Sequence, residues 1–378
     1  MKLICASDSF KGSLSSERIG ELLGQAAREA FPSVEFVPFR MADGGEGTLE
    51  AIRAVRSGEY LPLYVHDARM RPLRSGIFLC GDEAFVEAAS TCGLAKLDTC
   101  DRNPLETSSY GVGECISHAL AHRCTNINVG LGGSCTNDGG MGCLRALGVR
   151  FFDEDGNELV GFGADLARVA RIDESGLYPL VHEATFTIMS DVTNPLLGPN
   201  GATYVFGPQK GAGSKMLERL ESGMAHFTEV IAATHPNADF DTPGYGAAGG
   251  LGMALSVFLG AQMASGVEEV LAAVGFDSAL EGADLVVTGE GQLDEQSLQG
   301  KVVSGVVAHA RNAGVPVAAL CGSIALGSDR IAELGLALAE DISEGQTQEY
   351  AMAHAEENYL RAARTLFNGL AAKRAERK

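Results

Sequence analysis

Seven turns of this 378-residue sequence join glycine to acidic, hydroxyl, amide or lysine side chains, each where an apolar run ends. They lie at 7–13, 41–48, 130–142, 190–202, 206–212, 244–252 and 288–294. Ligands of open α/β sheets bind beyond the carboxyl ends of the strands, so turns of this kind predict one shared polar cleft. Backbone amides, lysines and carboxylates are also what phosphoryl transfer requires around the phosphates and Mg²⁺.

The segment GLGGSCTNDGGMG at 130–142 contains the most glycine of these turns. Successive N–H groups at a glycine turn form a concave anion site, so we predict a phosphate cradle here. The predicted phosphate contacts are Gly132, Gly133, Ser134 and Asn137. Asp138 directly follows Asn137, so it would be close enough to a bound phosphate to hold Mg²⁺ or water. The structural alternative is a tight strand-to-helix turn in which Asp138 caps the helix.

Carboxylates and lysines recur in the same turns. The carboxylates are Asp8, Asp43, Glu46, Asp138, Asp191, Glu290 and Asp294, and the lysines are Lys11, Lys210 and Lys301. Transfer from ATP needs one or two carboxylates on Mg²⁺, a base for the acceptor hydroxyl, and cations along the phosphates. Each carboxylate alone more often caps a helix or forms a turn, so the prediction depends on their occurrence together.

The elements that must position these turns alternate between strand and helix. Apolar runs at 2–7 and 34–39 predict strands, and helical spacing after Ser15, a suitable N-cap, predicts a helix between them. Further strands are expected at 127–131, 185–191 and 283–291, with helices at 110–122, after 213 and at 346–370. This alternation predicts an α/β protein of two domains, with 61–275 inserted into a split domain of 1–60 and 276–378.

Composition restricts the partners. The net charge of −20 opposes nucleic acid and anionic membranes. No apolar run approaches the roughly 18 residues that a membrane span needs, and the first residues do not resemble a signal peptide. The nine cysteines form no C-x-x-C pair, which favours reduced thiols and a cytoplasmic protein.

Two nucleotide-binding motifs bear on the choice of ligand. A Walker A loop is missing, because Glu295 stands where the glycine ahead of Gly300 and Lys301 would be needed. GYGAAG at 244–249 fits G-x-G-x-x-G, but a polar turn precedes it where a dinucleotide fold needs a buried strand. An NAD(P)-dependent dehydrogenase acting on a hydroxy acid therefore stays open as the alternative to a kinase.

As a set, the turns resemble one family, the bacterial-type glycerate kinases. The resemblance rests on DSFKGSLS at 8–15, ADGGEGT at 42–48, GLGGSCTNDGG at 130–140, SDVTNPLLGPNGATYVFGPQKGA at 190–212, PGYGAAGGLG at 243–252 and TGEGQLDEQSLQGKV at 288–302. It implies ATP- and Mg²⁺-dependent phosphorylation of D-glycerate, with 2-phosphoglycerate expected over 3-phosphoglycerate. It also implies a Rossmann- or flavodoxin-like parallel sheet split by the second α/β domain, with the active site in the cleft between them.

Residue roles follow as hypotheses from this resemblance. The ATP phosphates are assigned to Gly132, Gly133, Ser134, Asn137 and Lys301, and Mg²⁺ to Asp138 and Glu290. The catalytic residues are Asp191, as base, with Lys11 and Asp8; substrate contacts are Ser9, Asp43, Glu46 and Asn194. A kinase for another small hydroxy acid remains a second alternative, and the sequence leaves open whether the protein is a monomer or a homo-oligomer.

Overall fold

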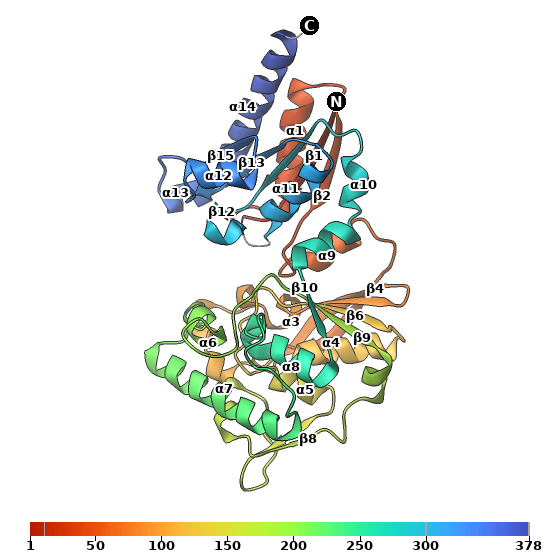
Figure 1. The fold of residues 1–378 in the computed structure, drawn as a ribbon, viewed down its shortest axis with the longest axis vertical. Helices are drawn as coiled ribbons and strands as arrows, with labels where there is room; N and C mark the ends of the chain where they lie inside the picture. Colours follow the sequence, from red (N-terminus) through yellow and green to blue (C-terminus); the bar gives the residue numbers. More distant parts are fainter. Residues whose placement is uncertain (11, 299–300, 377–378) are drawn as a thin grey trace. The chain divides into compact units, whose positions relative to one another are not determined.

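The computed structural model describes residues 1–10, 12–298 and 301–376, and the described chain forms two compact units. The first unit contains residues 1–43, 50–55 and 267–378, and the second contains 44–49 and 56–266. Each unit has its own sheet and its own helices (Figure 1). The domain boundaries predicted at 60/61 and 275/276 stay predictions.

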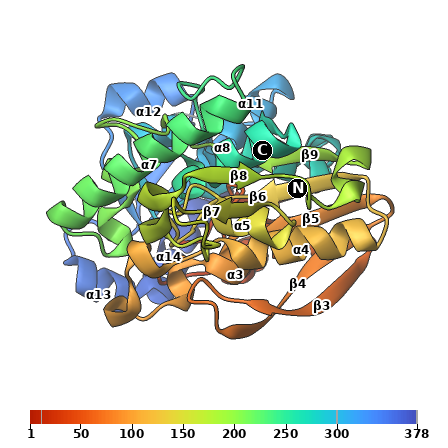
Figure 2. The ribbon, with the colours of Figure 1, turned by 90° about the horizontal axis from the view of Figure 1, so that it is seen from below.

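The second unit is built on a mixed sheet with the strand order β10-β9-β6-β5-β4-β3. Strands β5, β6, β9 and β10 run parallel, whereas β3, β4 and β5 pair antiparallel. Helices α4 and α5 lie side by side (Figure 2). Helix α4 packs on β3, β4 and β5, and α8 contacts α5 and β9. The elements are β3(Glu59–His66), β4(Pro72–Cys80), β5(Glu83–Glu87), α3(Ala89–Cys92), α4(Tyr110–Ala121), β6(Asn126–Gly130), α5(Met141–Ala146), β7(Arg150–Phe152), β8(Arg171–Asp173), β9(Thr185–Met189), α6(Ala202–Phe206), α7(Ser214–Thr234), α8(Leu251–Leu259) and β10(Gln262–Ala264).

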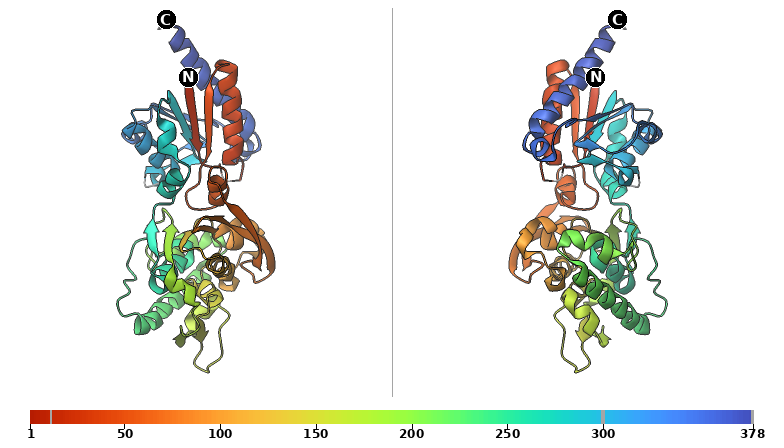
Figure 3. Two further views of the ribbon diagram at one scale, coloured as in Figure 1. Left: turned by 90° about the vertical axis from the view of Figure 1, so that its right-hand side faces the viewer. Right: turned by 90° about the vertical axis from the view of Figure 1, so that its left-hand side faces the viewer.

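The first unit is built on a parallel sheet with the strand order β15-β13-β11-β1-β2. Numbered along the chain, this is the flavodoxin-like order 2-1-3-4-5, which confirms the predicted fold class. Figure 3 shows α1 and α14 on one face of the sheet and α11 on the other. The elements are β1(Lys2–Ser7), α1(Ser16–Ala30), β2(Glu35–Arg40), α10(Phe276–Leu280), β11(Leu285–Gly289), β12(Gln292–Leu293), α11(Val302–Asn312), β13(Val317–Cys321), β14(Ser323–Ile324), α12(Ser328–Leu334), β15(Leu338–Asp341), α13(Gln348–Ala353) and α14(Ala355–Glu376). Helix α2(Thr48–Arg53) begins in the second unit and ends in the first. Helix α9(Gly266–Ala273) starts at the last residue of the second unit and continues in the first.

The pattern that predicted the first helix also explains its packing. Ser15 accepts a hydrogen bond from the Arg18 amide at 3.1 Å, so its predicted role as N-cap is confirmed. Ile19, Leu22 and Leu23 on the same helix are buried in the core with residues of β1, β11 and α14. This apolar face holds α1 on the sheet and so sets the position of the turn that follows β1.

The single helix predicted at 346–370 is wrong in one respect, because the structure has two helices that meet at His354. Both the backbone N–H and the ring Nδ1 of His354 are directed at the Tyr350 carbonyl, at 3.0 and 2.9 Å. The His354 ring also stacks on the Tyr350 ring, with centroids 3.9 Å apart. These contacts end α13 and turn the chain into α14.

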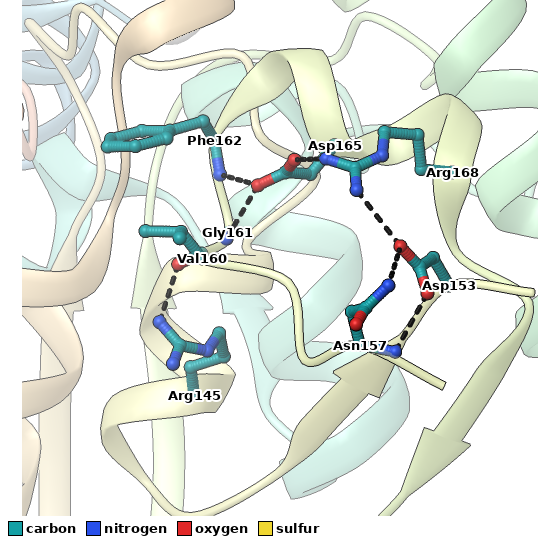
Figure 4. Close-up of polar contacts among 8 residues, drawn as sticks. All are labelled: Arg145, Asp153, Asn157, Val160, Gly161, Phe162, Asp165 and Arg168. Carbon is teal, nitrogen blue, oxygen red and sulfur yellow. Dashed lines mark hydrogen bonds and ion pairs between the residues drawn. The ribbon is translucent and has the colours of Figure 1, made fainter. Parts of the chain in front are cut away.

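The irregular segment after β7 carries a group of polar contacts (Figure 4). The Asp165 carboxylate accepts hydrogen bonds from the amides of Gly161 and Phe162 and from Arg168, all near 3.0 Å. Arg168 also bonds Asp153, and Arg145 of α5 donates to the Val160 carbonyl at 2.6 Å. The segment is therefore fastened to the helix that follows the glycine-rich turn at 130–142.

Candidate functional site

A cavity of about 710 Å³ opens in the first unit, beyond the carboxyl ends of β1, β11, β13 and β15. Strand order reverses between β1 and β11, and this switch point is where open α/β sheets place their ligands. Ser7 pairs with Gly289 at the ends of these two strands, and the Asp8 amide continues the pairing to the Gly289 carbonyl at 2.9 Å. Asp8 and Glu290 therefore leave neighbouring strands together.

The cavity collects several of the residues that the sequence singled out. Asp8, Ser9, Asp43, Glu290 and Lys301 line it, and so does Asp294. The Asp8 Oδ1 atom accepts a hydrogen bond from the Ser9 amide at 2.7 Å. Lys11, which was expected to be catalytic, lies outside the described residues. Residues from three separate turns thus belong to one cavity.

Glu290 is the most unusual of these side chains. The residue is only 6% exposed, and within the described residues its Oε1 atom has no hydrogen-bond partner. Its Oε2 atom lies 3.7 Å from the Lys301 ammonium, which is also 3.9 Å from Asp294 Oδ1. Burial raises the pKa of Glu290, and Ser297 and Lys301 oppose that rise. A buried carboxylate with an unused oxygen suits a divalent cation, because Mg²⁺ prefers oxygen ligands.

Two glycines allow the cavity floor to form. A Cβ atom on Gly289 would lie 2.0 Å from the Leu320 carbonyl oxygen, and one on Gly322 would lie 2.4 Å from the Gly291 carbonyl oxygen. The short parallel pair β12 and β14 continues from these positions. Glycine at 289 and 322 is therefore required by close backbone approach, and this keeps the strand ends open toward the cavity.

The cavity also has a wall that sequence reasoning missed. It consists of the turn after β15 and of α13, and its lining residues include Asp341, Ile342, Ser343, Gln348, Ala351 and Met352. The signal was present, since EDISEGQ at 340–346 is again an acidic glycine turn after a strand. That strand is only partly buried, so its apolar pattern is weak.

The glycine-rich turn of the second unit follows β6 and has an open start and a buried end. Gly133 is exposed and has φ +75°, whereas Thr136, Asn137 and Asp138 are fully buried. The Gly132 amide donates to the Gly44 carbonyl at 3.2 Å. A Cβ on Gly133 would lie 3.9 Å from the Glu46 amide, so the 44–47 loop borders the open start. The predicted phosphate contacts at Gly132, Gly133 and Ser134 stay predictions.

Asp138 is held by protein donors. Its Oδ2 atom accepts from the Ser109 amide and hydroxyl at 2.7 and 2.8 Å and from the Gly142 amide at 3.1 Å, and its Oδ1 atom accepts from the Gly140 amide at 3.2 Å. Burial raises the pKa of this carboxyl, and the same hydrogen bonds oppose that rise. These contacts order the starts of α4 and α5. They fit the cap alternative, and the role of Asp138 as a magnesium ligand stays a prediction.

The buried side chain of Lys210 binds the backbone of the glycine-rich turn at 130–142. It is 3% exposed, and its Nζ atom donates to the Thr136 carbonyl at 2.7 Å. Burial lowers the pKa of Lys210 to about 8. Asn137, whose side-chain amide donates to Thr203 at 3.3 Å, has an Oδ1 atom without a partner among the described residues. Lys210, one of the three lysines considered as cations for the phosphates, is thus bound to a backbone carbonyl.

Asp191 and Asn194 follow β9, the strand next to β6. The Asp191 Oδ1 atom accepts from the Ser265 hydroxyl at 2.7 Å and from the Gly266 amide at 3.0 Å. Asn194 donates to the Asn200 carbonyl at 2.9 Å, and its own carbonyl accepts from the amides of Gly244 and Gly246. The structure fixes both residues locally, and their roles as base and substrate contact stay predictions.

The segment with the G-x-G-x-x-G pattern serves the interior of the second unit. No strand precedes it within the described residues 235–243, which form turns. A Cβ on Gly249 would lie 2.1 Å from the Thr136 carbonyl oxygen, and the Gly249 carbonyl accepts the Gly139 amide at 3.0 Å. Its glycines therefore permit close packing on the glycine-rich turn, which disfavours the dinucleotide alternative.

The cysteines give no sign of a nucleophile or a metal centre. Burial raises the pKa of the Cys135 thiol, inside the glycine-rich turn, to about 12. Within the described residues, no three His, Cys, Asp or Glu side chains are grouped as metal ligands. In the same part of the chain, none of the helices combines the length and apolar character of a membrane span.

Comparison with known proteins identifies the family. The model of the glycerate kinase family matches residues 3–371. The chain is 42% identical to the glycerate 2-kinase of Escherichia coli (strain K12) over 86% of both chains, and 39% identical to the glycerate kinase of Bacillus subtilis (strain 168) over 97% of both. A crystal structure from Salmonella typhimurium LT2 that carries the name glycerate kinase 2 covers 99% of both chains, with a TM-score of 0.82 and 38% identity. The chain therefore belongs to the glycerate kinase family.

Proposed function

We propose that this protein transfers the γ-phosphoryl group of ATP to a hydroxyl group of D-glycerate in a Mg²⁺-dependent reaction. The family match over residues 3–371 carries this proposal. Relatives named glycerate kinase, at 36–42% identity, support the acceptor, and the name glycerate 2-kinase supports 2-phosphoglycerate as the product. The nine free cysteines, unpaired as in a reducing compartment, support a cytoplasmic location.

The residues of the first unit fit a magnesium nucleotide. Glu290 offers an unused, buried oxygen, and Lys301 offers a cation 3.7 Å from its other oxygen. When bound, Mg²⁺ would offset the charge that develops on the β- and γ-phosphates. In the proposed roles, Glu290 holds the cation and Lys301 contacts a phosphate oxygen.

Asp191 is the proposed base for the acceptor hydroxyl. Its Oδ1 atom is oriented by Ser265 and Gly266. A carboxylate that is held in one orientation can accept the hydroxyl proton as the phosphoryl group is transferred. Asp191→Asn should lower kcat by about 100-fold and leave the KM for ATP nearly unchanged, because the base acts in the transition state.

The function is tested by incubating the full chain with ATP, Mg²⁺ and D-glycerate and identifying the product by phosphorus and proton NMR. We expect 2-phosphoglycerate, and no product after EDTA treatment until Mg²⁺ is restored. Formation of 3-phosphoglycerate would correct the position of transfer. Reduction of NAD(P)⁺ by glycerate without any ATP-dependent product would replace the kinase by the dehydrogenase alternative.

A further inference from the structure

We propose that the cavity of the first unit is the nucleotide site, with the base against the wall formed by Ile342, Ala351 and Met352 and the phosphates at the end that holds Glu290 and Lys301. This inference rests on the proposed kinase function. It goes further by assigning the nucleotide to one cavity and each part of the nucleotide to one end of it.

The size of the cavity favours the nucleotide over the acceptor. Cavities that enclose a ligand of drug size measure roughly 300 to 1,000 Å³. The cavity of about 710 Å³ lies within that range. Glycerate, a three-carbon acid, would fill only a small part of it and would leave most of its walls in contact with water. A nucleoside triphosphate would reach both ends.

One end has the chemistry of a phosphate site. Helix α11 begins at Val302, directly after Lys301, and runs to Asn312, so it is long enough for its N-terminal amides to carry a partial positive charge. The Lys301 ammonium lines the cavity at the same end. Glu290, buried and with an unused Oε1 atom, lies beside it. Together they offer donors for phosphate oxygens and an acceptor for a cation.

The charge of the cavity requires the nucleotide to bind with its cation. Six acidic residues line it, namely Asp8, Asp43, Glu290, Asp294, Asp341 and Glu344, and among its described lining residues Lys301 is the only basic one. A free triphosphate would meet net repulsion here. A magnesium complex would meet less, because the cation offsets the phosphate charge and can bond the unused Glu290 oxygen.

The wall formed by the turn after β15 and by α13 suits a flat aromatic base. Ile342 and Ala355 are buried there, whereas Met352 is 43% exposed. The Met352 Cε atom lies 3.2 Å from the Cβ position of Gly12, so this side chain reaches across to the 8–14 turn. Methionine packs well against aromatic rings. Gln348 on the same wall carries an amide that can donate to and accept from the edge of a base.

A bulky side chain at the base end provides the test, with a matched control on the same helix. Ala351 lines the cavity, whereas Ala353 is exposed and does not line it. Ala351→Trp should weaken the binding of Mg-ADP to the full chain at least 10-fold by calorimetry and raise the KM for ATP equally, while the KM for glycerate changes less than 2-fold. Ala353→Trp should change the Mg-ADP affinity, the KM for ATP and the KM for glycerate by less than 2-fold. In the wild type, EDTA should weaken ADP binding at least 10-fold.

A second pair covers the case in which Ala351→Trp does not fold. Met352→Ala should weaken Mg-ADP binding about 3-fold through lost contact, and Glu349→Ala, at an exposed position of the same helix that does not line the cavity, should not. Unchanged Mg-ADP affinity in both cavity variants, or a rise in the KM for glycerate alone, would overturn the assignment while leaving the kinase function intact. A wild type that binds Mg-ADP and phosphorylates another acid would keep the assignment and correct the acceptor.

Discussion

The cavity of the first unit and the glycine-rich turn of the second are built from the same residue types, yet their charged groups are in opposite situations. Glu290 keeps an unused oxygen, and its cation Lys301 stays 3.7 Å away. Asp138 accepts four hydrogen bonds from the protein, and Lys210 is committed to a backbone carbonyl. Glycine, acid and lysine in a turn therefore indicate a polar site, whereas the remaining hydrogen-bonding capacity shows which groups can serve a ligand.

The glycines of the second unit also differ in how much space surrounds them. A Cβ on Gly142 would lie 2.0 Å from the Ser108 hydroxyl oxygen, and one on Gly249 would lie 2.1 Å from the Thr136 carbonyl oxygen. These glycines let buried segments of the second unit pack closely. Gly133, by contrast, would carry its Cβ into a space where the nearest atom is 3.5 Å away. Close packing thus accounts for the buried glycines of this segment, whereas its exposed start at Gly133 has open space beside it.

The largest effect is expected at Asp138. Asp138→Asn would turn an amide donor toward N–H and O–H donors, so we expect the free energy of unfolding to fall by about 3 kcal/mol or more in urea titrations. Asp155→Asn, at an exposed position, should change it by less than about 0.5 kcal/mol. If Asp138→Asn were as stable as the wild type but its kinase activity no longer depended on Mg²⁺, Asp138 would be the metal ligand. The contrast drawn above between Asp138 and Glu290 would then be wrong.

Glu290→Gln is expected to be the next largest change, and it should affect activity more than stability. Loss of the buried carboxylate should lower kcat/KM for ATP about 100-fold, or about 2.7 kcal/mol, because the cation loses a charged ligand. Binding of Mn²⁺, followed by paramagnetic resonance with ADP present, should weaken as well. Glu349→Gln changes an exposed carboxylate that does not line the cavity and should stay within 3-fold. Normal Mn²⁺ binding by Glu290→Gln would remove the metal role.

The sequence predicted much of the first unit because its strands are buried apolar runs that end in polar glycine turns. Parallel strands bring their carboxyl ends to one edge of the sheet, so the pattern alone led us to expect Asp8, Asp43 and Glu290 together, and all three line the cavity. The wall at 342–355 was missed, because β15 is only partly buried and lacks a clear apolar pattern.

The roles of Asp138 and Lys210 could not be predicted for a different reason. Ser109, which binds Asp138, is 29 residues away in the chain, and Thr136, which binds Lys210, is 74 residues away from it. Whether a charged side chain is free for a ligand depends on such distant donors and acceptors. Local spacing therefore identifies a polar turn but does not tell which of its charged groups are already bonded to distant parts of the protein.

Lys210→Met tests the buried lysine through pH. Burial lowers the pKa of Lys210 to about 8 from its ordinary 10.5, so between these values the unfolded chain binds more protons than the folded one. The stability of the wild type relative to Lys210→Met should therefore rise with pH across this window, by about 2 kcal/mol from pH 8 to 10. Buried thiols are common to both proteins and cancel in the difference. Lys215→Met, at an exposed position of α7, serves as the control substitution, and a flat difference for Lys210→Met would mean that Lys210 is solvated.

The smallest expected effect concerns His309 of α11, the helix that begins beside the cavity. Its Nδ1 and Nε2 atoms lie 2.5 Å from Asp277 and 2.8 Å from Glu268, on α10 and α9. Burial lowers the pKa of His309, but hydrogen bonds to Asp277 and Glu268 outweigh it and raise the pKa above 6.5. The stabilisation is therefore complete below pH 6.5 and is lost as pH rises through the raised pKa.

Because Asp277 and Glu268 are largely exposed, the difference between wild type and His309→Gln should stay below about 1 kcal/mol. It should be larger at pH 6 than at pH 9 in thermal unfolding, and His122→Gln, at an exposed position, serves as the control substitution. If the difference in stability between the wild type and His309→Gln grew toward pH 9, the folded protein would hold His309 neutral. The two carboxylates would then not be what fixes α11, and the position of Lys301 at the cavity would depend on the packing of α11 against the sheet alone.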